Sequence, residues 1–376
     1  MKNKKIFISF AFVAGLAALL GSHFVYQPVT VQTEPIVIGY MGALTGSAAF
    51  IGKSTQAGIM LAADQVNEEG GVLGRPIEII YEDSACDATT AATAAMKLIN
   101  IDNVVGIIGA LCSHATLAAA PIAEAAQIPL ISYTSSAPAI TDAGEYIFRV
   151  VPSDVFQAQH AARYLHEDLQ VERVAILHCR NDYCEGNKEA FLEAFKGEVT
   201  SQEGHEEGAT DLRTQIIKVM ATNPEAVYFL GFPTDTVVGI KQMAELGFLD
   251  RVKVLGPDTW STQTIWDSLG ALADGVMYMQ PGNIKDDTSF SKDILAYLAP
   301  EEISVYTSRA YDALRIMTQS INISEGVNGE DIVETLYELS NYQGVADSYS
   351  FDQNGDVVGA TYDILQIQDG LPVLIK

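Results

Sequence analysis

The sequence predicts an α/β fold made of two doubly wound, Rossmann-like lobes. From about residue 35 to residue 281, short apolar runs alternate with segments of helical periodicity. Apolar strands bracketed by helices are typical of parallel sheets that are covered on both faces. The 376 residues contain more repeats of this unit than one sheet accommodates, so we expect two lobes.

The alternation starts with a strand over 35–42 and a helix over 54–71. In that helix Ile59, Ala62 and Val66 share one apolar face, and a Gly-Gly pair ends it. The further expected strands cover 76–83, 104–111, 129–134, 173–178, 226–232, 252–258 and 275–281. The further expected helices cover 89–100, 112–127, 155–169, 186–197, 212–221 and 235–247.

The last thirty residues follow another pattern. Residues 347–376 predict a meander of antiparallel strands, with turns at Asn354-Gly355 and Asp369-Gly370. No low-complexity linker separates the two predicted lobes.

The charge of the chain excludes several classes of partner. The net charge is −26, and Lys2, Lys4 and Lys5 are the only charged residues before Glu34. Without that segment 19 basic residues face 48 acidic ones, a net charge of −29. Such a chain repels nucleic acid and anionic membranes, so we expect neither as a partner.

Residues 1–33 are expected to be a signal peptide or an N-terminal membrane tether. A short basic region precedes an uncharged run of 16 residues, close to the length of a signal core and short for a transmembrane helix. No clear cleavage site precedes Glu34, so both alternatives stay open. Either way, the rest of the chain is expected outside the cytoplasm.

Four cysteines in an exported chain favour disulfides. Three pairings are possible, and the simplest joins each cysteine to its neighbour in the sequence: Cys86 to Cys112 and Cys179 to Cys184. The rival interpretation is a metal site at Cys179, which adjoins a histidine. Zinc sites need closer cysteine spacing and more ligands, so we expect no metal.

Polar and aromatic side chains follow several predicted strands at the point where a helix begins. Ser113, Ser136, Tyr183, Phe232 and Asp258 all lie at such junctions. Ligands bind open α/β sheets beyond the carboxyl ends of the strands, and helix starts there offer N–H groups to a carboxylate. Any one of these residues is more often a helix cap. Together they indicate a ligand site to which both lobes contribute residues.

At these residues the chain resembles a known family. The stretch GALTGSAAFIGKSTQAGIMLAADQVNEEGGVLGRPIEIIYEDSACD and the later motifs ALCSHAT, YTSSAPAIT, YCEG and LGPD are similar, in order and spacing, to the periplasmic binding proteins for branched-chain amino acids. These are the type I solute-binding proteins of ABC transporters. The resemblance covers nearly all of the chain from Glu34 to its end.

The resemblance implies two lobes joined by three crossovers that close on a ligand by a hinge motion. We expect lobe 1 to comprise 34–152 plus 283–348, and lobe 2 to comprise 153–282 plus 349–376. It also implies that the Cys86–Cys112 pair matches a family disulfide.

The resemblance assigns roles to individual residues. Ser113, Thr134 and Ser136 are expected to hold the α-carboxylate of an amino acid and to share its α-ammonium. Asp258 takes the place of an acidic residue that pairs with the ammonium, and Tyr183 matches an aromatic contact from the second lobe. The aromatic positions around the side-chain pocket are matched by Phe50, Phe232 and Tyr306.

Three departures from the family pattern bear on specificity. Asp258 replaces the usual glutamate and is one methylene shorter, Phe50 and Phe232 lack hydroxyls that some relatives carry, and Cys184 stands where glycine is common. We therefore expect an exported, monomeric solute-binding protein that captures a neutral, branched-chain amino acid for the permease and ATPase subunits of an ABC importer. The alternative is a membrane-tethered amino-acid or amide receptor for a sensor partner. We expect no enzyme activity and no cofactor.

Overall fold

Two large sheets organise the part of the chain that a computed structural model describes, residues 34–46, 48–281, 288–298, 303–359 and 361–376. The predicted signal or tether segment, 1–33, lies outside the described residues. Within them, no helix combines the length and the apolar character needed to cross a membrane.

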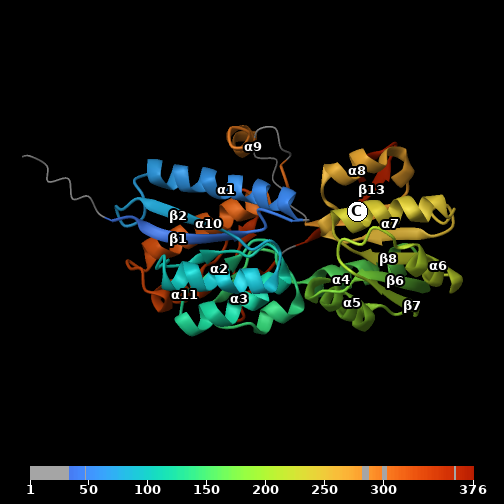
Figure 1. Cartoon of the computed structure of the whole chain (residues 1–376), viewed down its shortest axis with the longest axis horizontal. Coiled ribbons are helices and arrows are strands. Elements are labelled where there is room, and N and C mark those ends of the chain that lie inside the picture. Colours follow the sequence, from blue (N-terminus) through green and yellow to red (C-terminus); the bar gives the residue numbers. More distant parts are fainter. Residues whose placement is uncertain (1–33, 47, 282–287, 299–302, 360) are drawn as a thin grey trace, which may run out of the picture. The chain divides into compact units, whose positions relative to one another are not determined.

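The first sheet has five parallel strands in the order β2-β1-β3-β4-β5. Helix α1 packs against α10, and α2 packs against α3. Figure 1 shows α1 on one side of β1 and β2, with α2 and α3 on the other. The strands are β1 (Ile36–Gly42), β2 (Ile77–Asp83), β3 (Ile107–Ile108), β4 (Leu130–Ser132) and β5 (Ile147–Arg149). The helices described with this sheet are α1 (Ala49–Glu68), α2 (Ala88–Asn100), α3 (Ser113–Ala126), η1 (Pro138–Asp142), α9 (Thr288–Ile294), α10 (Thr307–Ile323) and α11 (Gly329–Glu338).

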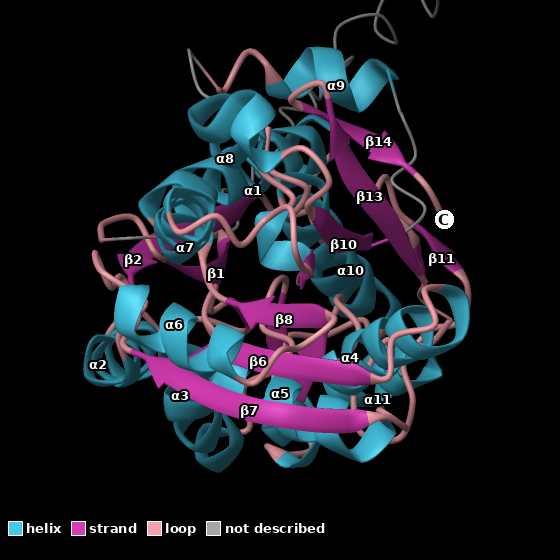
Figure 2. Ribbon diagram, turned by 90° about the vertical axis from the view of Figure 1, so that its right-hand side faces the viewer, coloured by secondary structure: helices cyan, strands magenta, loops and turns pink. Residues whose placement is uncertain are grey.

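The second sheet has seven strands in the order β14-β13-β10-β9-β8-β6-β7. The strands from β6 to β10 run parallel, whereas β13 and β14 pair antiparallel at one edge. Figure 2 shows β6, β7 and β8 side by side. The strands are β6 (Arg173–Cys179), β7 (Glu198–His205), β8 (Ala226–Leu230), β9 (Lys253–Gly256), β10 (Met277–Pro281), β13 (Tyr362–Gln368) and β14 (Leu371–Leu374). The helices are α4 (Asp154–Arg163), η2 (Tyr164–Asp168), α5 (Asp182–Ala194), α6 (Arg213–Ala221), α7 (Pro233–Glu245), η3 (Asp258–Trp260), α8 (Gln263–Leu269) and η4 (Gly270–Ala273).

Both faces of the second sheet are buried, which explains why its strands read as continuous apolar runs. Successive side chains of a strand point to opposite faces. In β6, Val174 and Ile176 enter a core shared with α4 and α5, whereas Ala175 and Leu177 enter a second core beneath α6, α7 and α8. The predicted α/β architecture of two doubly wound lobes is therefore confirmed. The chain passes between the sheets three times: after β5, between β10 and α10, and before β13.

The observed strand β3 is shorter than the predicted strand over 104–111. Only Ile107 and Ile108 form the ladder, although Val105 and Gly109 still donate backbone hydrogen bonds to Val37 (2.9 Å) and Ile131 (3.0 Å) on the neighbouring strands. The apolar run marks a buried segment correctly, but an apolar pattern does not say where ladder pairing stops.

The predicted C-terminal meander is split between two places. Strands β13 and β14 form the expected hairpin at Asp369-Gly370, where both residues have positive φ as a tight two-residue turn requires. Strand β12 (Ser348–Tyr349) instead pairs with β11 (Tyr342–Gln343) in a separate two-stranded sheet. The predicted turn at Asn354-Gly355 is present.

The lobe boundaries proposed from the sequence stay a prediction. One observation bears on the division between 348 and 349: Tyr349, Phe351 and Val357 pack into the core of the first sheet. The chain therefore leaves that core after Val357, and β13 is the next element to join the second sheet.

Candidate ligand-binding site

Residues that follow the strands of both sheets line a small buried pocket. Its volume is ≈ 30 Å³. The pocket is lined by Ile51, Leu111, Cys112, Ser113, Thr134, Ser136, Tyr183, Phe232, Asp258, Thr259 and Tyr306. Seven of the eight ligand-binding residues predicted from the sequence are in this set.

The exception is Phe50, which lies outside this pocket and lines an adjoining cavity. Its neighbour Ile51 lines both spaces. Both residues lie in the first turn of α1, and on a helix consecutive side chains point in different directions. The sequence match at Phe50 is therefore one residue away from Ile51, the side chain that lines the pocket.

Two hydroxyls, on residues that follow strands of the first sheet, form one wall of the pocket. Backbone partners determine whether each hydroxyl can donate or accept a hydrogen bond. Ser113 Oγ accepts a hydrogen bond from the Ala137 N–H (3.2 Å), which leaves its own hydrogen to be donated. Thr134 Oγ1 donates to the Leu111 carbonyl (2.5 Å), which leaves its lone pairs to accept. One side chain can therefore serve an anionic group and the other a cationic group.

The start of α3 adds backbone donors to the same wall. The first N–H groups of a helix have no partner within the helix, and together they favour an anion. The residue that precedes the helix, Cys112, makes no side-chain hydrogen bond to it. Ser113 is its first residue, so these donors lie beside the Ser113 hydroxyl.

A disulfide holds this helix start in place. Cys86 and Cys112 are bonded, with their Cα atoms 5.4 Å apart. His114 lies close to both sulfur atoms, and its Nε2 is 2.5 Å from the Cys86 carbonyl oxygen. Because both sulfurs are already in the disulfide, they are not available as thiolates for a metal ion.

Asp258 provides the negative charge of the opposite wall. It begins η3 and is 4% exposed. Burial raises the pKa of its carboxyl above the ordinary value, while Gln157, Tyr306 and Tyr183 act in the opposite direction. The Tyr183 hydroxyl donates to Asp258 Oδ1 at 3.3 Å. A carboxylate in this setting gains from a cation more than a solvated one would, because water does not screen the pair.

Aromatic rings complete this wall. The Tyr183 and Phe232 rings are 5.7 Å apart between centroids and tilted by 40°. Phe232 immediately precedes α7, and Tyr306 immediately precedes α10. All three are at most 9% exposed. The pocket therefore combines one carboxylate, several hydroxyls and an apolar surface.

A polar network behind the pocket was not predicted from the sequence. Asp154, the first residue of α4, is fully buried, and burial together with the nearby Asp258 charge raises the pKa of its carboxyl well above the ordinary value. Asn187 Nδ2 donates to Gln157 Oε1 (2.7 Å) and to Asp154 Oδ1 (3.4 Å), and the Tyr228 hydroxyl donates to Asn187 Oδ1 (2.7 Å). Asp154 carried the same signal as Asp258, an acid at a helix start, but Gln157 and Asn187 lie within helices and carried none.

The second disulfide lies beside Tyr183. Cys179 ends β6 and bonds to Cys184, with Cα atoms 5.5 Å apart. Both cysteines are fully buried. The bridge closes the turn into α5, where the Asn181 side chain also accepts a hydrogen bond from the Cys184 N–H (2.9 Å). It therefore restrains the backbone that presents Tyr183 to the pocket.

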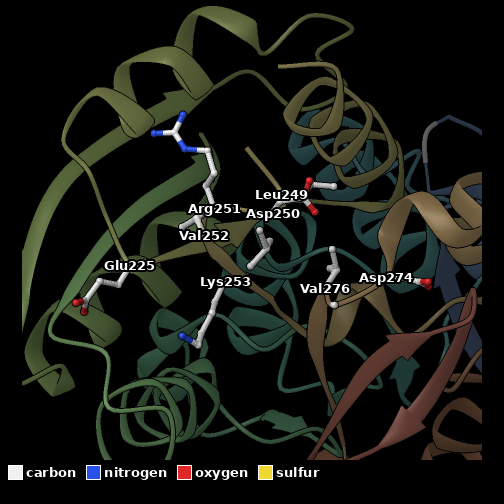
Figure 3. Close-up of a pocket in the computed structure, with 10 residues that line it drawn as sticks. Glu225, Leu249, Asp250, Arg251, Val252, Lys253, Asp274 and Val276 are labelled. Atoms are coloured by element: carbon white, nitrogen blue, oxygen red, sulfur yellow. The ribbon is translucent and has the colours of Figure 1, made fainter. Parts of the chain in front are cut away.

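A larger cavity of ≈ 330 Å³ lies at the other ends of the strands (Figure 3). Glu225, Lys253 and Val276 lie at or just before the starts of β8, β9 and β10. The Glu225 carboxylate accepts two backbone hydrogen bonds and Asp274 accepts one. In Figure 3 the charged side chains point apart and do not converge on a common point. This cavity does not have the features of a site for a small charged ligand.

The pocket that contains Asp258 lies between two doubly wound lobes, and we call it the polar pocket. This arrangement is typical of the class of proteins that close around a small solute. The profile of one family, periplasmic binding protein, matches residues 35–371. The chain belongs to the periplasmic binding protein family. This membership confirms the predicted family and the expectation that the chain is not an enzyme.

Individual relatives are similar over nearly their whole length. A leucine-, isoleucine-, valine-, threonine- and alanine-binding protein of Pseudomonas aeruginosa is 26% identical, over 91% of this chain and 92% of that protein. A Leu/Ile/Val-binding protein of Escherichia coli is 27% identical, over 94% and 95%. The crystal structure of a leucine-binding protein from Thermotoga maritima is 24% identical, with a TM-score of 0.83 over 91% of this chain and 98% of that one. It supports the fold.

Proposed function

We propose that this protein captures a neutral α-amino acid as its zwitterion outside the cytoplasm. It then delivers the amino acid, as a monomer, to the permease and ATPase subunits of an ABC importer. The observation that carries the proposal is the arrangement of charge in one pocket. Asp258 lies in the same pocket as Ser113 and the start of α3. These groups complement an ammonium and a carboxylate on one small molecule.

Each end of the zwitterion meets groups of suitable chemistry. The ammonium pairs with Asp258 and donates to Thr134 Oγ1, whose own hydrogen is already used. The carboxylate accepts from Ser113 Oγ and from the N–H groups of α3. Ser136 adds a further hydroxyl on the same wall.

The charge of the side chain is restricted by the same lining. Asp258 is the one charged residue among the described residues of the pocket, and the ammonium neutralises it. A second charge on the ligand would enter beside Phe232, Ile51 and Leu111 without a partner. Losing its hydration there costs several kcal/mol. The names of the relatives, which bind leucine, isoleucine and valine, support the same class of ligand.

Calorimetry with the purified full-length protein tests the proposal. Leucine, valine, lysine, aspartate and 4-methylpentanoate, the analogue of leucine that keeps the carboxylate and lacks the amine, would be titrated separately. We expect leucine and valine to bind most tightly, and 4-methylpentanoate to bind at least 30-fold more weakly than leucine because it leaves Asp258 unpaired. Tightest binding of a charged amino acid, or equal binding of 4-methylpentanoate and leucine, would reject the proposal.

A further inference from the structure

A second, apolar cavity adjoins the polar pocket. Its volume is ≈ 360 Å³, against ≈ 30 Å³ for the pocket that contains Asp258. Its lining includes the apolar side chains of Phe50, Ile51, Pro233, Val237, Val238 and Ile265. We call this space the outer cavity.

Three segments of the chain pass from the polar pocket to the outer cavity. Ile51 lines both. Phe232 lines the pocket and the next residue, Pro233, lines the outer cavity. Thr259 lines the pocket and Thr262, three residues further on, lines the outer cavity. The two spaces are therefore adjacent along three parts of their walls, with Ile51 as the shared side chain.

The polar pocket is too small for a bulky side chain. A water molecule requires roughly 10–15 Å³ on this measure, so the pocket has room for about two waters. A charged amino-acid head group would occupy that room and displace part of the wall. The outer cavity shares Ile51 with the polar pocket and has volume to spare.

We propose that the side chain of the bound amino acid leaves the polar pocket past Ile51 and lies in the outer cavity, so that the preferred ligands are neutral amino acids with long apolar side chains. This inference rests on the proposed amino-acid function and specifies its substrate class. The occupant is the tail of the same molecule whose head group meets Asp258.

The lining of the outer cavity supports an apolar tail. None of its described lining residues is charged. Val237 and Val238 pack against one hydrophobic core and Phe50 packs against the other. Each methylene removed from water into such a space improves binding.

A homologous series of ligands tests the inference on the unaltered, full-length protein. Calorimetry would compare alanine, 2-aminobutyrate, norvaline, norleucine, 2-aminoheptanoate and 2-aminooctanoate. If the tail enters the outer cavity, affinity should increase by roughly fourfold with each added methylene through to 2-aminooctanoate. A maximum at norvaline followed by a fall would overturn the inference.

A cavity-filling substitution provides a second, independent test of the inference. Val237→Phe should reduce the ratio of the 2-aminooctanoate affinity to the norvaline affinity by at least tenfold, because the larger ring occupies the space of the tail. Val327→Phe is the matched control, at a residue that is 39% exposed and lines neither cavity, and should leave that ratio unchanged. An unchanged ratio in Val237→Phe would also overturn the inference.

These measurements distinguish a failure of the outer-cavity inference from a failure of the amino-acid function. If short amino acids bind and long ones do not, the inference is wrong and the amino-acid function stands. If no member of the series binds, both are wrong. If affinity increases along the whole series and Val237→Phe removes the increase, both are supported.

Discussion

The Tyr183 hydroxyl donates a hydrogen bond to Asp258 Oδ1 at 3.3 Å, and both side chains are at most 4% exposed. Tyr183 follows β6, whereas Asp258 follows β9. The bond therefore connects two strand ends of the second sheet at the wall of the polar pocket. It orients the carboxylate that we assign to the ligand ammonium, and it leads to the first prediction.

Asp258→Asn should weaken binding of the natural amino acid without destabilising the unliganded protein. Leaving an ammonium buried without its counter-charge typically costs about 2–5 kcal/mol, roughly 30-fold to several thousand-fold in affinity. Because burial raises the pKa of the Asp258 carboxyl, the charged form opposes folding at pH 7, so the melting temperature should stay the same or rise.

Calorimetry and thermal unfolding check both parts of this prediction. Tyr183→Phe is the matched control, because it removes the hydrogen bond and keeps the charge, and we expect a smaller loss of about 1–2 kcal/mol. Unchanged affinity in Asp258→Asn would contradict the amino-acid proposal and favour a neutral or anionic ligand.

Ser113→Ala should weaken binding by about 1–2 kcal/mol, less than the loss of Asp258. The backbone N–H groups at the start of α3 remain in place to hold the ligand carboxylate. Ser135→Ala serves as the control. Its hydroxyl donates to the Ala110 carbonyl (3.0 Å) and does not line the pocket, so its loss should lower stability and leave affinity unchanged. Equal losses of affinity in the two variants would argue against a direct role for Ser113.

Asp154 should make the unliganded protein less stable as the pH rises. Its pKa is raised in the folded state by burial, so between the unfolded value, about 3.9, and the folded value the native state binds more protons than the unfolded state. The free energy of unfolding therefore falls with increasing pH across that window. Above the folded pKa of Asp154, the loss of unfolding free energy reaches its full value. Asp154→Asn should remove this part of the pH dependence.

Urea unfolding of both proteins from pH 4 to pH 8 measures the effect. Burial also raises the pKa of Asp312 to about 6, and its contribution falls with pH over pH 4 to 6 in both proteins. The difference between wild type and variant cancels Asp312 and reports Asp154 together with its electrostatic coupling to Asp258. We expect the variant to gain stability over wild type as the pH rises, and a constant difference would show that Asp154 does not titrate in this way.

Mass mapping under non-reducing conditions should find both disulfides in the protein. Replacing Cys86 and Cys112 with alanine should cost roughly 3 kcal/mol on the chain-entropy model, and replacing Cys179 and Cys184 about 2 kcal/mol, because the second pair closes a shorter loop. Denaturant titration of the two double variants compares them. A peptide that links a cysteine of one pair to a cysteine of the other would contradict the pairing.

Much of the fold follows from patterns that lie within a few residues of one another. Apolar strands of the second sheet, such as Ala226–Leu230, were predicted because burial on both faces demands side chains of the same kind in succession. The tail hairpin was predicted from Asp369-Gly370, because few residues adopt the positive φ angles of that turn. Most of the predicted pocket residues, such as Ser113 and Asp258, follow strands, and the carboxyl ends of parallel strands share one edge of a sheet.

Other features depended on contacts between segments that are distant in the sequence. The packing of α1 determined that Ile51, and not Phe50, faces the polar pocket, because one step along a helix turns the side chain by about 100°. Asn187 meets Asp154 and Gln157 through the packing of α4 on α5, which no local pattern encodes. The outer cavity exists because Ile51 and Phe50 lie opposite α7 and α8, more than 180 residues away along the chain. The volume of a space between two such elements depends on how they pack, and neither sequence segment contains that information alone.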